Sequence, residues 1–330
     1  MTTWMTFEGD DSAWDRLIDQ LGGTSPFATS GWARTKVSGR WTTTRAVAVV
    51  EGDVVAATQV FWLSILRVIT IGWIPGGIAS KGPLNAVGLS AWFAKCVKTR
   101  IFYLRSAFHR PRLVSDEESL IESGWSKSPK FIGASETFIL RRTENGLADP
   151  SRLTSNWKRN LQRGLQRNGA ASLWLAPDAS EISDLVREMV DFKKANGPQA
   201  VTTEESLKLV FREMQNRIVV VQVRDPEGKI QAVRGAFVTG DSAWDALAAA
   251  GVDARKSYSS YVCAWKLIEE LDARGINTFD LAGIDELRNE GVFNFKKGFG
   301  GERTVYLGEW DWASTPLARH IARIVISRLG

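Results

Sequence analysis

The sequence predicts a mixed α/β fold built from two similar units in tandem. The chain has 330 residues, more than one hydrophobic core usually organises, so two domains are expected. Hydrophobic residues make up 44% of the chain and charged residues 24%, as in a folded globular protein and unlike a disordered one. Two segments far apart in the sequence also share one order of apolar runs and turns. We therefore expect two α/β domains with mixed sheets.

Each half of the chain contains a predicted β-hairpin. In the first half, the apolar run Ala46–Val50 leads through a short acidic turn with one glycine into Val54–Leu63. In the second half, Ile218–Val223 leads through a similar turn into Ile230–Thr239. Two apolar runs joined by a short glycine-containing turn are typical of a hairpin.

The elements around the two hairpins also follow one order. A helix precedes each hairpin, and a strand, a loop, a helix and a strand follow it. The expected positions in the first half are Ser12–Leu21, Val68–Ile74, Val87–Thr99 and Ile101–Leu104, and those in the second half are Ala179–Ala195, Ala243–Ala250, Ser259–Arg274 and Asn277–Leu281. This order resembles the N-acetyltransferase-like (GNAT) α/β unit, present twice.

Cysteine and histidine usage argues against several kinds of site. Cys96 and Cys263 lie far apart in amphipathic, helix-like segments and form no Cys-x-x-Cys pair. Neither a disulfide framework nor a metal motif is therefore expected, which fits a reducing cytoplasm. His109 and His320 are the two histidines of the chain, which argues against a histidine metal site or a Ser-His triad.

The sequence predicts a cytoplasmic protein without stable membrane insertion. The N-terminus has no basic head, apolar centre and small-residue cleavage site in the order of a signal peptide. The longest apolar stretch, Val54–Leu66, is too short to span a bilayer. We expect no metal and no cofactor.

Positive charge is concentrated in two regions without acidic residues. Val54–Ser115 contains eight Lys and Arg residues and no Asp or Glu. The second region, Trp157–Arg167, contains Lys158, Arg159, Arg163 and Arg167, and its three arginines share one face at helical spacing. Such regions attract phosphates. A solvated basic face is the alternative, but two such regions in a chain with 37 acidic residues favour a polyanionic partner.

The stretch Gly291–Gly301 reads G-V-F-N-F-K-K-G-F-G-G. It places three phenylalanines, two lysines and four glycines in eleven residues, just after a predicted strand. Glycine lets backbone approach a ligand closely, phenylalanine supplies a wall and lysine a charge. We expect a ligand-facing, glycine-rich loop. A glycine-rich hairpin with solvated lysines is the alternative.

This stretch resembles the F-K-x-x-F-G-G signature that closes the FemABX peptidyltransferases. These enzymes move an amino acid from aminoacyl-tRNA onto a peptide amine. Further motifs follow in the order of the family: Pro26–Lys36, Trp73–Gly77, Tyr258–Trp265 and Thr278–Ile284. Each motif is weak alone, but together and in this order they are specific.

The resemblance implies roles for individual residues. Lys296 would stabilise the oxyanion and the leaving ribose oxygen, and Phe295 would form its hydrophobic wall. The implied acceptor-binding residues are Lys36, Trp32, Tyr258 and Tyr261. Lys158, Arg159, Arg163 and Arg167 are the expected tRNA contacts. A surface lysine at position 36 and core tyrosines at positions 258 and 261 are the structural alternatives.

The resemblance also implies the domain organisation. Residues 1–145 with 304–330 would form the first GNAT-like domain, with an acceptor-binding surface, and residues 146–303 the second. The chain has no sustained heptads for a coiled-coil arm, so it resembles the compact, armless members, and a monomer is expected. The amphipathic segment that begins at Leu317 would pack on the first domain, with a membrane-surface helix as the alternative.

Two departures from known patterns bear on the chemistry. A coenzyme A site needs an R/Q-x-x-G-x-G/A turn before the second-domain helix, and Tyr258 stands at its first glycine. In addition, Leu104–Phe108 lacks the carboxylate that relatives carry. We therefore expect substrate-assisted aminolysis of aminoacyl-tRNA. The acceptor is left open among a peptidoglycan precursor, a peptide natural product and a polysaccharide amine. An acyl-CoA-dependent N-acyltransferase and a polyanion-binding module without chemistry are the competing hypotheses.

Overall fold

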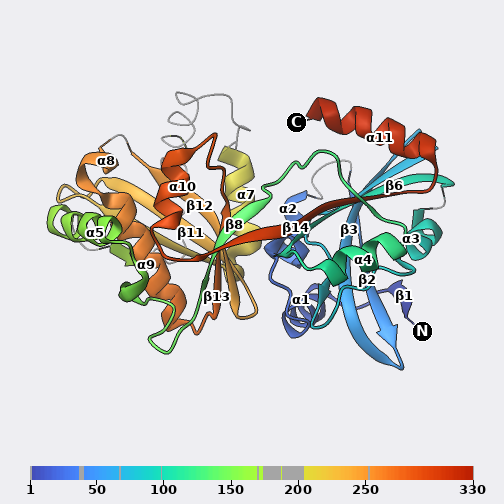
Figure 1. Cartoon of the computed structure of the whole chain (residues 1–330), viewed down its shortest axis with the longest axis horizontal. Coiled ribbons are helices and arrows are strands. Elements are labelled where there is room, and N and C mark those ends of the chain that lie inside the picture. Colours follow the sequence, from blue (N-terminus) through green and yellow to red (C-terminus); the bar gives the residue numbers. More distant parts are fainter. Residues whose placement is uncertain are drawn as a thin grey trace. The chain divides into compact units, whose positions relative to one another are not determined.

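The computed structural model describes residues 2–36, 41–66, 68–97, 99–168, 171–173, 187, 204–251 and 253–329 (Figure 1). The expected helix Ala179–Ala195 therefore lies outside the described residues except for residue 187. The chain forms two compact units. Unit 1 comprises Met1–Thr137 and Thr304–Gly330, and unit 2 comprises Phe138–Arg303.

Unit 1 is built on a mixed sheet with the order β1-β2-β3-β4-β6-β14, in which β5 pairs with β3 and β7 with β14. β4 and β6 run parallel, and the other neighbours are antiparallel. Its strands are β1 (Thr3–Thr6), β2 (Thr42–Val50), β3 (Asp53–Ile65), β4 (Ile69–Ile74), β5 (Ala79–Ser80), β6 (Ile101–Pro111), β7 (Ser126–Lys127) and β14 (Glu302–Ala313).

The helices of unit 1 bury apolar faces around this sheet. They are α1 (Asp11–Gln20), the short 3-10 helix η1 (Pro26–Ala28), α2 (Ser30–Lys36), α3 (Leu89–Val97), α4 (Val114–Glu122) and α11 (Pro316–Leu329). Phe93 of α3 and Leu104 of β6 are fully buried in the main core. α11 contacts β6 and buries Ala318 and Ala322, which lie one turn apart.

Unit 2 repeats the pattern with the strand order β8-β13-β12-β11-β10-β9. The strands are β8 (Glu136–Arg141), β9 (Ala171–Leu173), β10 (Ile218–Arg224), β11 (Ile230–Thr239), β12 (Ser242–Ala250) and β13 (Thr278–Gly283). β12 and β13 run parallel, with Ser242–Trp244 opposite Thr278–Asp280. β12 continues beyond this paired stretch to Ala250.

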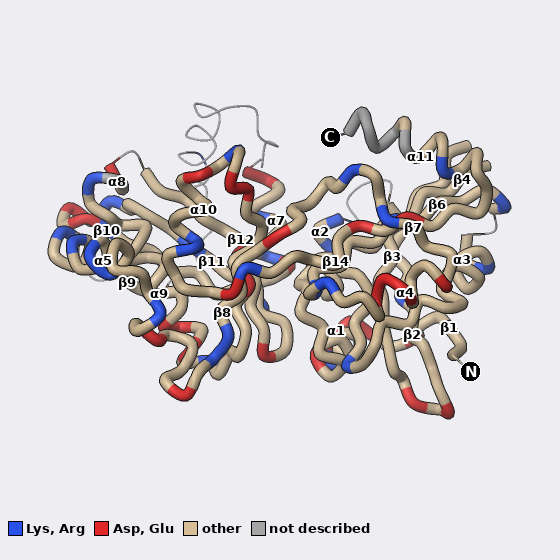
Figure 2. Tube along the Cα trace, viewed as in Figure 1, with Lys and Arg blue, Asp and Glu red and all other residues tan. Residues whose placement is uncertain are grey.

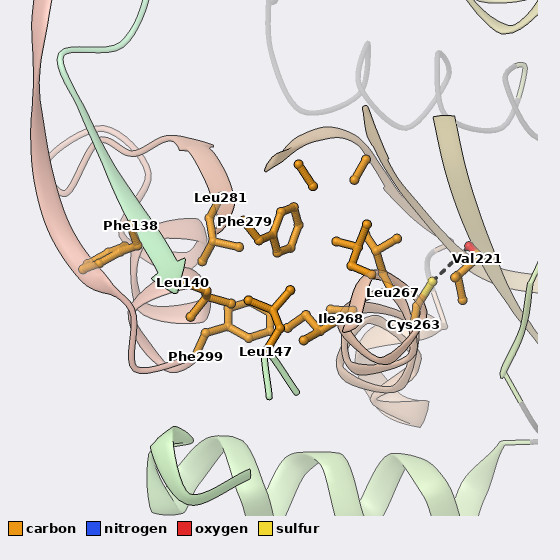
Figure 3. Packing of buried hydrophobic residues seen from close by; sticks show 14 of the residues in the cluster. Phe138, Leu140, Leu147, Val221, Cys263, Leu267, Ile268, Phe279, Leu281 and Phe299 are labelled. Carbon is orange, nitrogen blue, oxygen red and sulfur yellow. Dashed lines mark hydrogen bonds between the residues drawn. The ribbon is translucent and has the colours of Figure 1, made fainter. Parts of the chain in front are cut away.

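The described helices of unit 2 pack on both faces of its sheet, with α9 on the side of Val221 and Phe211 of α7 on the opposite side with Val220. They are η2 (Pro150–Arg152), α5 (Ser155–Arg167), α7 (Glu204–Met214), η3 (Gln215–Arg217), α8 (Ala254–Ser257), α9 (Ser259–Ala273) and α10 (Glu290–Lys297). Leu267 and Ile268 of α9 pack with Phe279 and Leu281 of β13 in the core (Figure 3). The predicted mixed α/β architecture is confirmed, since both units contain parallel and antiparallel strand pairs.

The prediction of a loop at Gly291–Gly301 is wrong. Residues Glu290–Lys297 form the helix α10, and only the residues after Lys297 turn away. The Asn289 side chain caps the helix by accepting a hydrogen bond from the Val292 amide at 3.2 Å. Phe293 and Lys296, one turn apart, form the buried face of α10. The glycine content suggested a loop, but a capped helix with one buried face forms instead.

Candidate functional site

Lys296 is a buried lysine of α10, and its side chain reaches the carboxyl end of β13. Its side chain is 7% exposed, and its Nζ donates to the carbonyls of Gly283 at 2.9 Å and Ala282 at 3.4 Å. Ala282 has φ 58°, a left-handed conformation, and its amide donates to Asp280 Oδ1 at 2.8 Å. This turn directs two consecutive carbonyls at the ammonium group. An ammonium group has three hydrogens, and among the residues that the structure describes these two carbonyls are its acceptors, so one hydrogen is left for a further acceptor.

The electrostatic surroundings of Lys296 are mixed. Burial lowers the pKa of its amine, the nearby Asp245 and Asp280 carboxylates oppose this shift, and Arg234 reinforces it. The result is a pKa below the ordinary lysine value. The cation at this site is therefore more acidic than a solvated lysine, as suits a group that donates a hydrogen bond to a developing negative charge.

Phe295 lies over a fixed arginine. The Arg234 guanidinium of β11 is 5.2 Å from the centre of the Phe295 ring. Asp245 of β12 holds Arg234 in bidentate fashion, with Nε–Oδ1 and Nη2–Oδ2 distances of 3.1 and 2.5 Å. Both side chains of this pair are more than nine-tenths buried. Because Asp245 holds Arg234 in place, the guanidinium group has a fixed position against one side of the Phe295 ring.

Aromatic rings enclose the rest of Phe295. Tyr261 of α9 and Phe299 meet it edge to face at centroid distances of 5.0 and 5.4 Å. Trp157 of α5 lies at 5.8 Å and donates from Nε1 to the Phe295 carbonyl at 3.2 Å. The predicted residues Phe295, Lys296 and Tyr261 thus lie in one cluster.

The glycines after α10 allow backbone to pass close to neighbouring groups. A Cβ at Gly298 would lie 2.4 Å from the Trp157 ring, and one at Gly301 would lie 3.0 Å from the Ile139 carbonyl oxygen. Gly300 is the most restricted, because it has φ +73° and its Cβ would lie 2.2 Å from the Arg152 carbonyl oxygen. The G-F-G-G part of the motif is thus required for backbone packing.

Replacing Gly300 with alanine should destabilise the protein by at least about 2 kcal/mol, since the side chain meets backbone in a left-handed conformation. The measurement is urea unfolding followed by tryptophan fluorescence. Gly228→Ala is the matched control, because Gly228 also has a positive φ (+85°) but its Cβ would meet nothing within 4 Å. Equal losses in the two variants would show that φ alone, and not the Arg152 contact, determines the cost.

The four predicted tRNA contacts of α5 are exposed, and Figure 2 shows Lys and Arg positions gathered along this helix. Arg163 and Arg167 turn onto the Tyr258 ring, with guanidinium-to-centroid distances of 5.8 and 5.3 Å. Arg159 donates to Asn156 of its own helix at 2.8 Å, and Lys158 lies 3.5 Å from the Ser151 carbonyl oxygen. Two of the four predicted tRNA contacts, Arg163 and Arg167, therefore lie against the same tyrosine ring.

The N-terminus of α9 is covered by α5. Tyr258 immediately precedes α9 with φ 58°, and a Cβ at Gly164 would lie 3.0 Å from its carbonyl oxygen. Asn168 donates to the Ser257 carbonyl at 2.7 Å and accepts from the Ser259 hydroxyl at 2.7 Å. Ser259 is fully buried. The turn in which an acyl-CoA enzyme would display open backbone amides is therefore packed against α5.

Lys36 and Trp32 lie together in unit 1, at the end of α2. The Lys36 Nζ is 4.6 Å from the centre of the Trp32 ring, and partial burial lowers the pKa of its amine. Asp15 of α1 fixes the start of α2 by accepting from the amide and the hydroxyl of Ser30, both at 2.8 Å. The motif Pro26–Lys36 thus forms one anchored turn-and-helix unit that presents a lysine on a tryptophan.

Two features of the sites were missed by sequence reasoning. The Arg234–Asp245 pair joins two strands of unit 2, and its sequence signal is a single charge within each of two apolar runs. In unit 1, Arg105 faces two carboxylates, Asp311 and Glu309, which are 0% and 6% exposed. These carboxylates are held by Arg105 and are closed to solvent, so they do not replace the missing carboxylate at Leu104–Phe108 as a base.

Among the residues that the structure describes, no group of three or more His, Cys, Asp or Glu side chains could hold a metal ion. The helices within the same described ranges are all too short or too polar to cross a membrane.

Comparisons with known proteins show the fold of the chain and a partial match to one family. The FemAB family model matches residues 182–325. The crystal structure of FemX superposes with a TM-score of 0.81 at 14% identity, over 96% of this chain and 99% of that chain. A tandem GNAT protein of the clavulanic acid biosynthesis pathway follows with a TM-score of 0.55, 11% identity and coverage of 96% and 99%.

The structure of L-PGS from Bacillus licheniformis gives a TM-score of 0.57 at 13% identity, over 98% of both chains. No curated protein sequence matches the chain. The predicted tandem GNAT-like fold is confirmed by these neighbours. The chain thus has the tandem GNAT fold of these neighbours, and its residues 182–325 are similar to the FemAB family.

Proposed function

We propose that this protein is a Fem-type acyltransferase that moves an amino acid from aminoacyl-tRNA to the amine of a peptide acceptor. The observation that carries the proposal is the environment of Lys296 in the F-K-x-x-F-G-G motif. Two backbone carbonyls hold its ammonium group, and among the described residues they leave one hydrogen for a substrate oxygen. A fixed donor of this kind stabilises the oxyanion of acyl transfer.

The reaction that fits this site is aminolysis of an ester. The acceptor amine attacks the ester carbonyl, a C–N bond forms, and the carbonyl oxygen becomes an oxyanion that Lys296 stabilises. The C–O bond to the ribose then breaks, and the proton that the amine loses passes to the ribose oxygen. No protein base is required if the substrate relays this proton. An ester is already activated, so orientation and charge stabilisation supply the rate.

Two features favour tRNA over coenzyme A as the donor carrier. The first is the exposed basic face of α5, where Arg163 and Arg167 stack on Tyr258 and can meet phosphates in a salt-dependent way. The second is the α9 N-terminus, which is packed against Gly164 and Asn168. A pyrophosphate at a helix N-terminus needs accessible backbone amides. The acyl-CoA-dependent reaction stays the alternative, because the GNAT fold also serves it.

The acceptor proposal rests on unit 1 and on the two tyrosines. Lys36 on the Trp32 ring would bind an anionic group of the acceptor, and Tyr258 and Tyr261 would line its channel. A peptidoglycan precursor is the first candidate for the acceptor. A peptide natural product and a polysaccharide amine are the others. A monomeric state and a cytoplasmic location stay predictions.

The test compares the two donors directly. The protein is mixed with a pool of aminoacyl-tRNAs or with acetyl-CoA, together with candidate muropeptides, and product mass and the thermal midpoint are measured. We expect an aminoacylated peptide and stabilisation by charged tRNA. The double variant Arg163→Gln/Arg167→Gln should weaken tRNA binding about tenfold and reduce its salt dependence.

Arg212→Gln is the matched control, because Arg212 is an exposed helix arginine of the same unit. Acetylated product and stabilisation by acetyl-CoA alone would overturn the choice of donor. Unchanged tRNA affinity in the double variant would remove α5 from the binding surface.

A further inference from the structure

The tip of the hairpin between β3 and β4 exposes three aliphatic side chains. Ile65, Leu66 and Val68 are 40%, 90% and 55% exposed. The Val68 amide donates to the Ile65 carbonyl at 3.0 Å, which closes the turn. Single exposed apolar residues are common on protein surfaces, but three at one projecting turn form a patch.

The backbone at the tip is also unfavourable for its sequence. Leu66 has φ 51°, a left-handed conformation that non-glycine residues adopt at a conformational cost. Glycine, asparagine or aspartate would be the ordinary choice at such a turn. Leu66 therefore has both the wrong backbone preference and the wrong polarity for a solvated tip. An external apolar contact for this side chain would account for both features.

The strand register places this tip beside two other segments of unit 1. Ile69, next to Val68, pairs with Ile101, which follows Arg100. The Thr70 hydroxyl lies 2.8 Å from that of Ser64 and 2.8 Å from that of Thr99. The hairpin tip and the connection from α3 to β6 thus meet at one end of the sheet.

The start of α11 reaches the same end of the sheet. Ser314 donates from its amide to the Phe102 carbonyl at 3.0 Å and accepts from the Phe102 amide at 2.9 Å. Leu317, one turn further along, is 56% exposed. A fourth exposed aliphatic side chain therefore lies in a segment that reaches the same end of the sheet as the hairpin tip.

The segments that form this end of the sheet carry no negative charge. Val54–Ser115 and the sequence from Trp312 to the C-terminus contain no Asp or Glu. Arg100, which is exposed, precedes Ile101 beside the tip, and Lys95, also exposed, lies in the last turn of α3, which leads to this connection. The surface thus combines projecting aliphatic side chains with neighbouring cations. We name it the apolar-basic end of unit 1 and define it by Ile65, Leu66, Val68, Lys95, Arg100 and Leu317.

We infer that the apolar-basic end of unit 1 docks on an anionic lipid surface. Aliphatic tips of this kind enter the boundary between headgroups and acyl chains, and each nearby cation gains from the negative surface potential. A second copy of the chain is a poorer occupant, because a stable dimer buries about 800 Å² per partner, far more than four aliphatic side chains provide. RNA is also poorer, because leucine and valine do not recognise phosphate. The inference does not depend on the proposed aminoacyl transfer.

The test is co-sedimentation of the full chain with vesicles of phosphatidylcholine, with or without 30 mol% phosphatidylglycerol, at low and high salt. We expect binding to the anionic vesicles at low salt, with the bound fraction falling as salt rises. Leu66→Asn should reduce the partition constant at least fivefold. Because asparagine tolerates the left-handed conformation, the same variant should keep or raise the thermal midpoint.

Leu287→Asn is the matched control, since Leu287 is 96% exposed in unit 2, and it should bind vesicles like the unchanged protein. No binding of the unchanged protein to anionic vesicles, or equal binding of Leu66→Asn, would overturn the inference. So would a Leu66-dependent dimer in sedimentation velocity, or loss of tRNA binding in Leu66→Asn with vesicle binding intact, because each would assign the surface to another partner.

Discussion

Replacing Lys296 with alanine should lower turnover of aminoacyl-tRNA by about 10² to 10³, the loss that follows removal of one oxyanion donor. Binding of tRNA should change little, because the basic face of α5 is untouched, so the effect should fall on kcat. The measurement is single-turnover kinetics with a radiolabelled aminoacyl-tRNA. Unfolding is measured in parallel, because Lys296 also donates to Ala282 and Gly283.

Lys297→Ala is the matched control for this variant. Lys297 is the next residue of α10, carries the same charge and is exposed, so its removal should leave turnover within about twofold of the unchanged protein. Equal losses in the two variants would indicate a general charge effect and would remove the specific role of Lys296. Wild-type turnover in Lys296→Ala would remove it as well.

The pH dependence of turnover is a second test of the role of the Lys296 amine. An oxyanion donor must be protonated, so its contribution is present below the pKa of Lys296 and is lost as the pH rises through that pKa. Burial lowers this pKa, so the alkaline loss should begin earlier than for a solvated lysine. Lys296→Arg should shift the loss to higher pH, because guanidinium stays protonated. An alkaline limb unchanged in Lys296→Arg would assign the titration to another group.

The sequence predicted those strands and helices whose type depends on residues close together in the chain. The hairpin strands at Ala46–Val50 and Ile230–Thr239 are apolar runs beside glycine turns, so their type follows from a few neighbouring residues. β14 was not predicted. Its burial depends on β6, which pairs with it from a position some two hundred residues away in sequence, as in the Arg105–Asp311 pair. Such long-range pairing leaves no local pattern to read.

The residues of the candidate site also fall into those that the sequence predicted and those that it did not. The resemblance to family motifs singled out Phe295, Lys296 and Tyr261. The fold places the rings of Phe295 and Tyr261 in contact, and Lys296 is the next residue of α10. Arg234 and Asp245 were missed because their pairing depends on the register of β11 and β12, which shifts between Gly235 and Ala236. The motif Gly291–Gly301 was found, but its helical form was not. Helix formation there depends on the Asn289 cap and on burial of Phe293.

Replacing Arg105 with methionine should destabilise the protein by about 3–5 kcal/mol, the loss expected when one partner of a buried ion pair is removed. Arg105 is 4% exposed and contacts Asp311 at 2.9 and 3.2 Å and Glu309 at 3.3 Å. Methionine keeps much of the volume but leaves both carboxylates without their cation. Urea unfolding is the measurement. Arg112→Met is the matched control, because Arg112 pairs with Glu117 at an exposed position and its loss should change the stability far less than the loss of Arg105.

The cost should come from the unpaired carboxylates, and a second substitution separates this cause from lost packing. Arg105→Met/Asp311→Asn should regain part of the stability, because it removes one of the two buried charges, whereas Asp311→Asn alone should be destabilising. Glu309 keeps the amides of Ile132 and Gly133 as donors at 2.8 Å in either case. Recovery would show that Arg105 is retained to neutralise carboxylates in the sheet. Since Arg105 lies directly opposite Asp311 in the register of β6 and β14, the same pair also opposes a one-residue slip, which would place an indole against the guanidinium.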